Sequence, residues 1–523
     1  MVGLIDDSFK QFPLNSRIRS LGDYGTVRYV GEVRNYNGLW IGVEWDDPHR
    51  GKHDGSINGV RYFQTAHSTS GSMIRPEKAE KFQSLQDAVR ERYLQSDGDD
   101  ALDAELLKET QSQLHAPLFE IVGMDKVAKR QSNPDKLKDV SVAISTVNTA
   151  GDLSSLTCLT TLNISSTLVW NWQIVAEIAM QIPTLFSLNL SSNKLILPSE
   201  EDIKNLEPHF RHITYIDLSK NGLKDWRDVL HVAQLWPNIE QLSLQENGIE
   251  DILPADCMKV FKNLRELHLS FNKLSNFVQI CKLGNIKTLE RLFLVNNNIE
   301  NVELPDCDYN EKVDIFPALN ALNLCDNPIS DSSDIFNELD KLPMLKNLCK
   351  TPKETGGFDD MFTLAVASIS QLQKLSKAEI PKEERRGAEY EIWRKHAKEW
   401  LQTENDPKAR KEFCKAHRSY PNLVKKYGSP VDFLPKSEKK ASTLVKVRIL
   451  NQATGETFEK KVPRQMSLQA LLGLIIKRFH LAGDMPKLSY KDAQHPTLIV
   501  PLENMSKNLD FYSIQDGDTV VVE

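Results

Sequence analysis

The clearest pattern in the chain is a spacing of apolar residues that recurs six times in its middle part. Each line has apolar residues at positions i, i+3 and i+5 and an asparagine at i+8, and successive asparagines lie 28, 26, 25, 25 and 30 residues apart. The asparagines are Asn193, Asn221, Asn247, Asn272, Asn297 and Asn327. An amphipathic helix, with its period of about 3.6 residues, does not fit this spacing. The pattern therefore predicts one short strand per line, followed by a turn.

The length and composition of these lines resemble the leucine-rich repeat. The resemblance implies an α/β solenoid over residues 116–350, in which the leucines fill the core. We expect the asparagine side chains to bond backbone groups of the neighbouring turn, since unpaired buried backbone groups are costly. An earlier line, which begins at Leu159, has Thr167 in place of asparagine and is read as a degenerate edge repeat.

A leucine-rich solenoid exposes the strand residues between its leucines on a concave face, and this face is usually a protein-binding surface. The predicted face mixes polar, charged and aromatic side chains, as an extended interface needs. Its residues are Tyr215, Asp217, Gln241, Gln245, Glu266, His268, Arg291 and Phe293. Plain solvation of an exposed sheet is the alternative for each of them, and Phe293 fits it least well. We read His268 as a surface or contact histidine, not as a metal ligand.

In residues 443–523 the apolar and polar positions follow a different pattern from the repeats, and this pattern predicts an α+β unit. Strands are expected at 445–450, 458–462, 487–491 and 518–522, with a helix that begins after Ser467 and runs through Phe479. The order β-β-α-β-β resembles the ubiquitin-like β-grasp fold, and residues 511–518 resemble the loop before its last strand. The resemblance implies a docking module, and the proteasome is one partner that it suggests. A passive structural module is the alternative.

Two segments join these parts. Residues 81–115 are expected to hold a short helix, with Phe82, Leu85, Val89 and Tyr93 at helical spacing, and an acidic linker over 97–103. Residues 351–440 are rich in charged helical sequence and predict a pair of helices that caps the solenoid. A linker over 430–440 follows.

The first 80 residues are dense in glycine and in short apolar runs, and they predict a small β-barrel. Gly51, Lys52, His53, Asp54 and Gly55 follow an aromatic run over 39–46. Glycine allows the chain to fold tightly and to leave N–H groups facing outward. A lysine in such a loop, beside tryptophans, suits an aromatic chain end that carries a carboxylate. A glycine-rich turn with a solvated lysine is the alternative.

Composition narrows the classes of function. The 523 residues predict three or four domains, and a net charge of -7 argues against a general nucleic-acid binder, which needs a basic footprint. Between Arg17 and Lys81, however, the chain has ten basic and eight acidic residues, and this slightly positive local charge suits binding of an acidic peptide. Seven scattered cysteines without a C-x-x-C pair predict reduced, mostly buried thiols of a cytosolic protein, and no zinc site.

Other patterns predict neither a cofactor nor a catalytic site. The start of the chain lacks a basic, apolar leader, and no stretch of about 20 apolar residues occurs, so neither secretion nor membrane spanning is expected. The sequence holds no P-loop, no H-E-x-x-H and no G-x-S-x-G motif. We therefore expect a binding protein and not an enzyme.

Several motifs of the first part together resemble the CAP-Gly domain over residues 14–80. They are G-x-x-G-T-V at 22–27, W-I-G-V-E-W at 40–45, G-K-H-D-G at 51–55, R-Y-F at 61–63 and G-S-M-I-R-P at 71–76. The resemblance implies binding of C-terminal Glu-Glu-Tyr/Phe tails, such as that of α-tubulin. The peptide-binding residues that it implies are Tyr36, Trp40, Gly51, Lys52, His53, Asp54, Gly55, Met73 and Arg75.

The CAP-Gly resemblance also implies a role for individual residues of this set, position by position. Lys52 would meet the terminal carboxylate or acidic side chains, Tyr36 and Trp40 would wall the aromatic slot, and Arg75 would add charge. His53 and Met73 depart from the usual asparagine and phenylalanine, so affinity or aromatic fit would differ. His53 would also make binding mildly dependent on pH.

The order of CAP-Gly, leucine-rich repeats and ubiquitin-like part is similar to that of a tubulin-folding cofactor. The resemblance implies a cytoplasmic, cytoskeleton-associated chaperone that captures α-tubulin by its tail and its body. It also implies joint action with other tubulin-folding cofactors, which hold β-tubulin, in assembly and dissociation of the αβ heterodimer. Three alternatives remain open here: a microtubule-associated adaptor, an adaptor that delivers tubulin to the proteasome, and a GTPase-activating enzyme.

Overall fold

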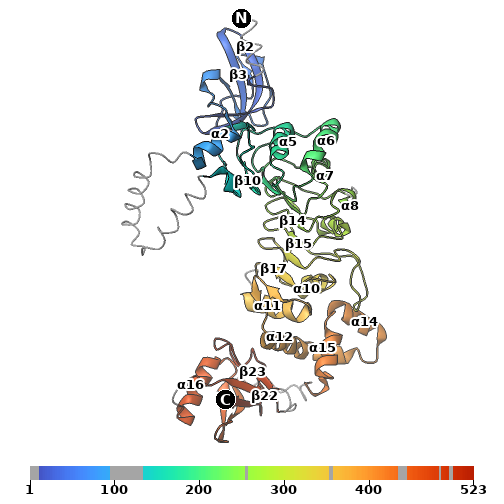
Figure 1. Ribbon diagram of the computed structural model, residues 1–523. Coiled ribbons are helices and arrows are strands. Elements are labelled where there is room, and N and C mark those ends of the chain that lie inside the picture. The colour runs from blue at the N-terminus through green and yellow to red at the C-terminus, as the bar shows by residue number, and fades with distance from the viewer. Residues whose placement is uncertain are drawn as a thin grey trace. The chain divides into compact units, whose positions relative to one another are not determined.

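The computed structural model describes residues 11–94, 133–253, 257–352, 357–433, 444–481, 485–493 and 499–523 (Figure 1). They belong to two compact units, one up to residue 298 without 276–278, the other made of 276–278 and 299–523. The expected acidic linker at 97–103, the solenoid start at 116–132 and residues 434–440 of the expected second linker lie outside the described residues. None of the described helices is long and apolar enough to cross a membrane.

The first part of the chain is a curled antiparallel sheet with strand order β1-β2-β3-β6. Its elements are β1 (Arg17–Ser20), β2 (Asp23–Val33), β3 (Tyr36–Trp45), the hairpin β4 (Ser56–Ile57) and β5 (Val60–Arg61), β6 (Gly71–Ile74) and the 3-10 turn η1 (Pro76–Lys78). The register of β2 against β3 shifts between Val27 and Tyr29 and again after Glu32. Such irregularities bend a strand and increase its twist. The curled sheet encloses Phe12, Ile18, Val27, Val30, Ile41, Val43 and Trp45, as a small β-barrel requires.

The segment after this sheet contains more than the expected helix. It consists of β7 (Gln83–Ser84), α2 (Leu85–Val89) and the π-helical turn η2 (Arg90–Leu94). The hydroxyl of Ser84 caps α2 by accepting a hydrogen bond from the Asp87 N–H. Strand β7 pairs in parallel with β9 (Val147–Thr149), a pairing that helical spacing alone could not reveal.

The solenoid strands of the first unit are parallel and in register, as the repeat pattern predicts. They are β8 (Asp139–Ser141), β10 (Thr161–Asn163), β11 (Ser187–Asn189), β12 (Tyr215–Asp217), β13 (Gln241–Ser243), β14 (Glu266–His268) and β15 (Arg291–Phe293). Strand β8 adds a repeat before the first one that the sequence pattern identified. Between the strands the chain forms η3 (Pro134–Lys136), α5 (Trp172–Gln181), α6 (Glu200–Leu206), η4 (Glu207–Phe210), α7 (Trp226–Ala233), α8 (Cys257–Val260), α9 (Phe277–Ile280) and η5 (Cys281–Asn285).

The predicted role of the asparagines is confirmed. The Asn272 side-chain oxygen accepts hydrogen bonds from the backbone N–H groups of Asn247, Gly248 and Ile249 at 3.0, 2.8 and 3.0 Å. Its amide nitrogen donates to the Leu244 carbonyl at 3.0 Å. One buried side chain thus satisfies three donors and one acceptor of the preceding repeat. The other repeat asparagines make bonds of the same kind, for example Asn247 to residues 221–223.

The second unit carries further repeats and a helical region. The strands are β16 (Ala321–Asn323), β17 (Asn347–Cys349), β18 (Lys374–Leu375) and β19 (Ala378–Glu379), with α10 (Ser333–Asp340) after β16. Strand β17 pairs in parallel with β16 and with β18, whereas β18 and β19 form an antiparallel hairpin. In the lines of β17 and β18, Lys350 and Lys377 stand where the earlier lines carry leucine, and buried Lys350 pairs with Asp331.

The expected pair of capping helices is wrong in number. Between residues 357 and 433 the structure has α11 (Gly357–Ser368), α12 (Lys382–Lys395), α13 (Ala397–Gln402), α14 (Pro407–Ala416), α15 (Tyr420–Tyr427) and η6 (Pro430–Phe433). Several of these helices share a largely aromatic core that includes Tyr390, Trp393, Phe413 and Tyr420. The abundance of charged residues concealed this core, because its apolar positions are spread over several short helices.

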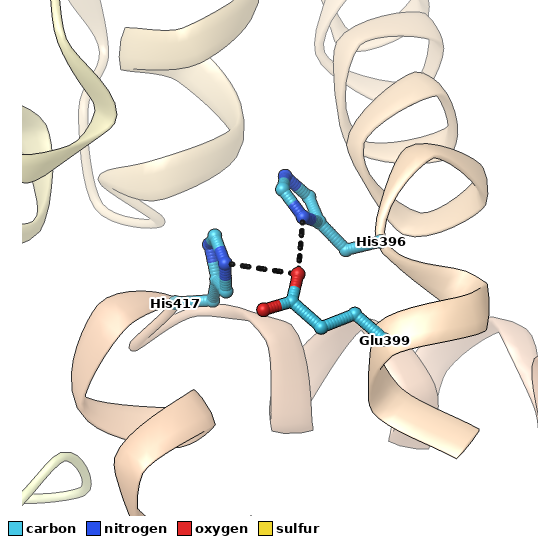
Figure 2. Close-up of side chains that lie close together, drawn as sticks. All are labelled: His396, Glu399 and His417. Carbon is cyan, nitrogen blue, oxygen red and sulfur yellow. Dashed lines mark hydrogen bonds and ion pairs between the residues drawn. The ribbon is translucent and has the colours of Figure 1, made fainter. Parts of the chain in front are cut away.

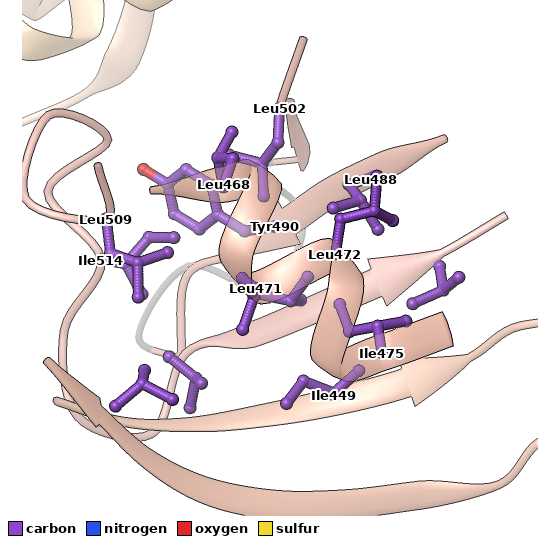
Figure 3. Packing of buried hydrophobic residues seen from close by; sticks show 14 of the residues in the cluster. Ile449, Leu468, Leu471, Leu472, Ile475, Leu488, Tyr490, Leu502, Leu509 and Ile514 are labelled. Atoms are coloured by element: carbon purple, nitrogen blue, oxygen red, sulfur yellow. The ribbon is translucent and has the colours of Figure 1, made fainter. Parts of the chain in front are cut away.

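The last part of the chain has the expected β-grasp arrangement. A mixed sheet of order β21-β20-β24-β22-β23 contains β20 (Leu444–Asn451), β21 (Thr457–Pro463), β22 (Leu488–Lys491), β23 (Ile499–Pro501) and β24 (Thr519–Val522). Helix α16 (Leu468–Phe479) begins after Ser467, whose hydroxyl accepts from the Ala470 N–H. Figure 3 shows Leu471, Leu472 and Ile475 of α16 packed over Ile449 and Leu488 of the sheet. Strand β23 was not predicted.

Replacement of Asn272 by alanine should destabilise the solenoid locally. The change leaves three N–H groups without an acceptor, two of them buried, and each buried group left so costs roughly 1–3 kcal/mol. We expect faster hydrogen exchange of the amides of residues 247–249, by a factor that corresponds to at least about 2 kcal/mol. Asn298→Ala, at an exposed position one residue after the repeat asparagine Asn297, is the control. Equal exchange in the two variants would contradict the role of the repeat asparagines.

Candidate functional site

Strand β6 holds both halves of the predicted peptide pocket. At its start, the Gly71 carbonyl accepts hydrogen bonds from the Lys52 and His53 N–H groups at 2.8 and 3.2 Å, and the Gly71 N–H donates to the His53 carbonyl at 2.8 Å. A side chain at Gly51 would place its Cβ 2.4 Å from the Gly71 carbonyl oxygen. Gly55 has a φ of +93°, and its Cβ would lie 2.1 Å from the Phe63 carbonyl oxygen. The glycines are therefore required for this close approach.

His53 and Asp54 are used inside the loop. The Nδ1 atom of His53 accepts a hydrogen bond from the Gly55 N–H at 3.0 Å, and burial lowers the pKa of this imidazole. The Asp54 carboxylate pairs with Arg61 at 2.8 Å and accepts from the Ser56 N–H at 3.0 Å. Its pKa is lowered, chiefly by the hydrogen bond from Arg61. Both side chains thus shape the loop.

Lys52 is different from its neighbours because its side chain is exposed. Within the described ranges it makes no ion pair, so its ammonium group is available to a negatively charged ligand. The fixed backbone on either side of Lys52 limits the space that this charge can sample.

The aromatic half of the pocket lies beyond the other end of β6. The rings of Tyr36 and Trp40 meet edge to face at 5.9 Å, and Tyr36 is 47% exposed. The Arg75 guanidinium lies 3.9 Å from the Trp40 ring centroid and donates to the carbonyls of Leu39 and Asn37 at 3.0 and 2.6 Å. Arg75 was expected to add charge to the pocket. These contacts show a second use, because they fix Trp40 and the start of β3.

Met73 lies within β6, half buried and opposite Gly42 of β3. The structure thus places all nine predicted pocket residues in β3, in β6 or its immediate continuation, and in the loop bonded to β6. An exposed cation and two accessible aromatic rings on this frame can accept an aromatic residue with a nearby carboxylate.

The predicted concave residues form two rows across neighbouring strands. Tyr215, Gln241, Glu266 and Arg291 occupy consecutive partner positions of β12 to β15. Asp217, Ser243, His268 and Phe293 form the second row. Gln245 was expected in a strand, but it lies in the turn after β13, and Ser243 occupies the strand position instead. Counting two residues from Gln241 would have identified Ser243.

Contacts between neighbouring strands fix the orientation of the side chains in these rows. Glu266 accepts from His268 Nε2 at 2.6 Å and also pairs with Arg291. The His268 and Phe293 rings stack at 4.2 Å with an interplanar angle of 4°. Burial, followed by the nearby Asp217 carboxylate, raises the pKa of Tyr215. The face is therefore a preorganised surface of charge and aromatic rings. The sequence predicted which residues belong to it, with Gln245 in place of Ser243, but not these contacts.

Comparison with known proteins shows the family to which the chain belongs. Residues 14–79 match the family model of the CAP-Gly domain. Over 524 aligned positions the chain is 54% identical to a Drosophila melanogaster protein named tubulin-specific chaperone E, and the match covers 100% of both chains. The chain belongs to the tubulin-specific chaperone E family.

More distant members of the family match over almost the same length. The mouse protein of that name is 34% identical, with 97% of this chain and 98% of the mouse protein covered. A solved structure of the C-terminal ubiquitin-like domain of mouse tubulin-specific chaperone E is 27% identical and covers 16% of this chain and 91% of its own. Its TM-score is 0.15.

The environment of His53 predicts a pH effect on the loop. Because burial lowers its pKa in the folded state, protonation favours the unfolded loop, and the stability that neutral His53 contributes is lost as pH falls below about 6.5. We expect the Gly55 amide to exchange faster, relative to its intrinsic rate, at pH 5.5 than at pH 7.5. His53→Asn keeps a side-chain acceptor that does not titrate, so this variant should show a smaller change. The same pH dependence in both proteins would exclude His53 as its source.

Proposed function

We propose that this chain is a tubulin chaperone that captures α-tubulin at two places, without being an enzyme. The CAP-Gly pocket holds the acidic C-terminal tail, and the concave face of the solenoid holds the folded body. It acts in the cytoplasm with other tubulin-folding cofactors, which hold β-tubulin, in assembly and dissociation of the αβ heterodimer. The observation that carries the proposal is that one strand, β6, holds the exposed Lys52 loop at its start and Arg75 on the Tyr36 and Trp40 pair beyond its end, in a chain related over its full length to tubulin-specific chaperones.

The chemistry of the pocket supports a tail that ends in an aromatic residue. A terminal carboxylate, or the glutamates before it, can pair with Lys52, while Tyr36 and Trp40 receive the ring. Such charge-assisted contacts are stronger than neutral ones. The backbone bonds from the loop around Lys52 to Gly71 support a fixed position for the charge that would meet the tail.

The concave face supports a second contact with a folded partner. Its side chains are held by one another before any partner arrives, so less conformational freedom is lost on binding. Two linked contacts of modest strength raise the overall affinity by about 10²–10⁴ where both can be made at once. The flexible tail is then a tether, and the solenoid supplies most of the grip. GTP hydrolysis occurs on tubulin in this proposal.

Replacing Lys52 by alanine should weaken binding of the intact αβ-tubulin dimer by about tenfold, because one charge-assisted contact worth roughly 1.4 kcal/mol is lost. Binding of the full-length chain would be measured by a titration of tubulin and by the size of the complexes. Lys81→Ala, an exposed lysine of the same part of the chain, is the control.

Tubulin that lacks its C-terminal tyrosine makes this test specific. If Lys52 contacts the terminal residue of the tail, Lys52→Ala should have a much smaller effect on trimmed tubulin than on intact tubulin. Equal effects on both would exclude a contact that depends on the terminal tyrosine. Binding of assembled microtubules in place of the free dimer would contradict the chaperone proposal and favour the adaptor.

The concave contact has its own matched pair of variants. Arg291 pairs with Glu266 inside the two rows. Arg265 lies immediately before strand β14, outside the rows; its side chain is 54% exposed and pairs with Glu290. We expect Arg291→Ala to weaken binding of trimmed tubulin at least about tenfold, as for a central interface arginine, and Arg265→Ala to leave it unchanged. If both variants bind like the unchanged chain, the concave face is not the second contact.

A further inference from the structure

Three side chains with metal-ligating atoms converge in the helical region of the second unit. His396 stands between α12 and α13, Glu399 lies in the first turn of α13, and His417 follows the end of α14. Figure 2 shows both imidazole rings directed at the same carboxylate oxygen of Glu399. None of these residues belongs to the pocket or to the concave face.

The distances suit a single transition-metal ion. His396 Nδ1 and His417 Nε2 lie 3.4 and 3.7 Å from Glu399 Oε2, and the three atoms all lie within 4.8 Å of one another. Ligand atoms about 2.0–2.1 Å from a tetrahedral zinc ion are about 3.3 Å apart. Small side-chain rotations would bring the three atoms to this separation. We propose that His396, Glu399 and His417 form a zinc site that ties α13 to the end of α14.

The two imidazoles lie close together and are largely shielded from water. Their side chains are 18% and 16% exposed, and their ring centroids are 4.0 Å apart. A neutral imidazole has the lone pair that a metal ion needs, so the pair offers two nitrogen ligands at one place.

The surroundings hold the rings but leave one side open. The His417 ring packs on Phe413 at 4.7 Å, and the His396 ring meets Tyr420 edge to face at 6.3 Å. This packing orients the ligands, as the support around a metal site must do. Aromatic packing alone, however, does not require a carboxylate between the two ring nitrogens. The Glu399 side chain is 58% exposed, so an ion can enter there and a water can complete its coordination.

The donor set also indicates which metal fits. Two imidazoles and one carboxylate suit Zn²⁺, whereas Ca²⁺ and Mg²⁺ prefer oxygen ligands throughout. Bound zinc would link the end of one helix to the start of another across the aromatic core. The site connects short helices that are separated by turns, and its three protein ligands leave one position to water.

The test uses the full-length chain, Zn²⁺ and the spectroscopic probe Co²⁺. We expect Co²⁺ to give visible absorption of a nitrogen and oxygen site, which Zn²⁺ abolishes, and Zn²⁺ to raise the unfolding temperature of the helical region. Glu399→Gln and His417→Ala should each lower the Zn²⁺ affinity by at least about tenfold. Glu412→Gln, an exposed glutamate on α14, is the matched control and should bind like the unchanged chain.

Glu399→Gln keeps the size of a mostly exposed side chain, so it tests the site even if a histidine variant does not fold. Cysteines elsewhere in the chain can also bind zinc, and thiolate ligation would show as a charge-transfer band of the Co²⁺ protein. Equal Zn²⁺ affinity of the unchanged chain and Glu399→Gln would overturn the proposal. So would a Co²⁺ spectrum that shows only thiolate ligation. Neither result bears on the binding of tubulin.

Discussion

The structure of the solenoid depends on one constraint: a single repeat cannot supply hydrogen-bond acceptors for all the backbone N–H groups of its own turn. Each tight turn leaves backbone N–H groups directed inward, where water does not reach them. The asparagine of the next repeat supplies the acceptor, as Asn272 does for three consecutive amides. Because each repeat completes the one before it, the strands are locked in register, and the residues between the leucines are brought into straight rows. The proposed binding face therefore depends on the hydrogen bonds beneath it.

The same dependence of a surface on buried backbone bonds occurs in the CAP-Gly part. Lys52 is exposed, yet its position is set by Gly51, Gly55 and Gly71, which allow two segments of backbone to touch. Arg75 likewise holds the aromatic side in place, because its guanidinium donates hydrogen bonds to two backbone carbonyls and packs on the Trp40 ring. In both surfaces the groups that would meet a partner are few, and most of the surrounding residues hold them in place.

Features that follow from spacing along the chain could be predicted from the sequence, whereas contacts between distant residues could not. Spacing along the chain predicted the repeat asparagines, the β-grasp order of the last part and the Ser467 cap. The pairing of β7 with β9 and the aromatic core around Trp393 join residues that are distant in sequence, so no local pattern announces them. Cysteine burial was also predicted wrongly: of the six cysteines whose side chains are described, only Cys281 and Cys414 are buried. His396 and His417 lie at the ends of different helices. The fold brings these ends together, so the sequence alone could not predict that the two histidines meet.

The lysines in the last repeats have a consequence for self-association. A parallel sheet that simply stopped would present an open edge, which is a template for pairing with another chain. Here the exposed Lys377 stands where the earlier repeats carry leucine, and the chain turns back as the antiparallel strand β19, where Lys374 pairs with Glu379 at 3.3 Å. Charge and reversal of direction together make this edge a poor template for cross-β aggregation. Such protection matters at high protein concentration, where sheet edges left bare would recruit one another into fibres.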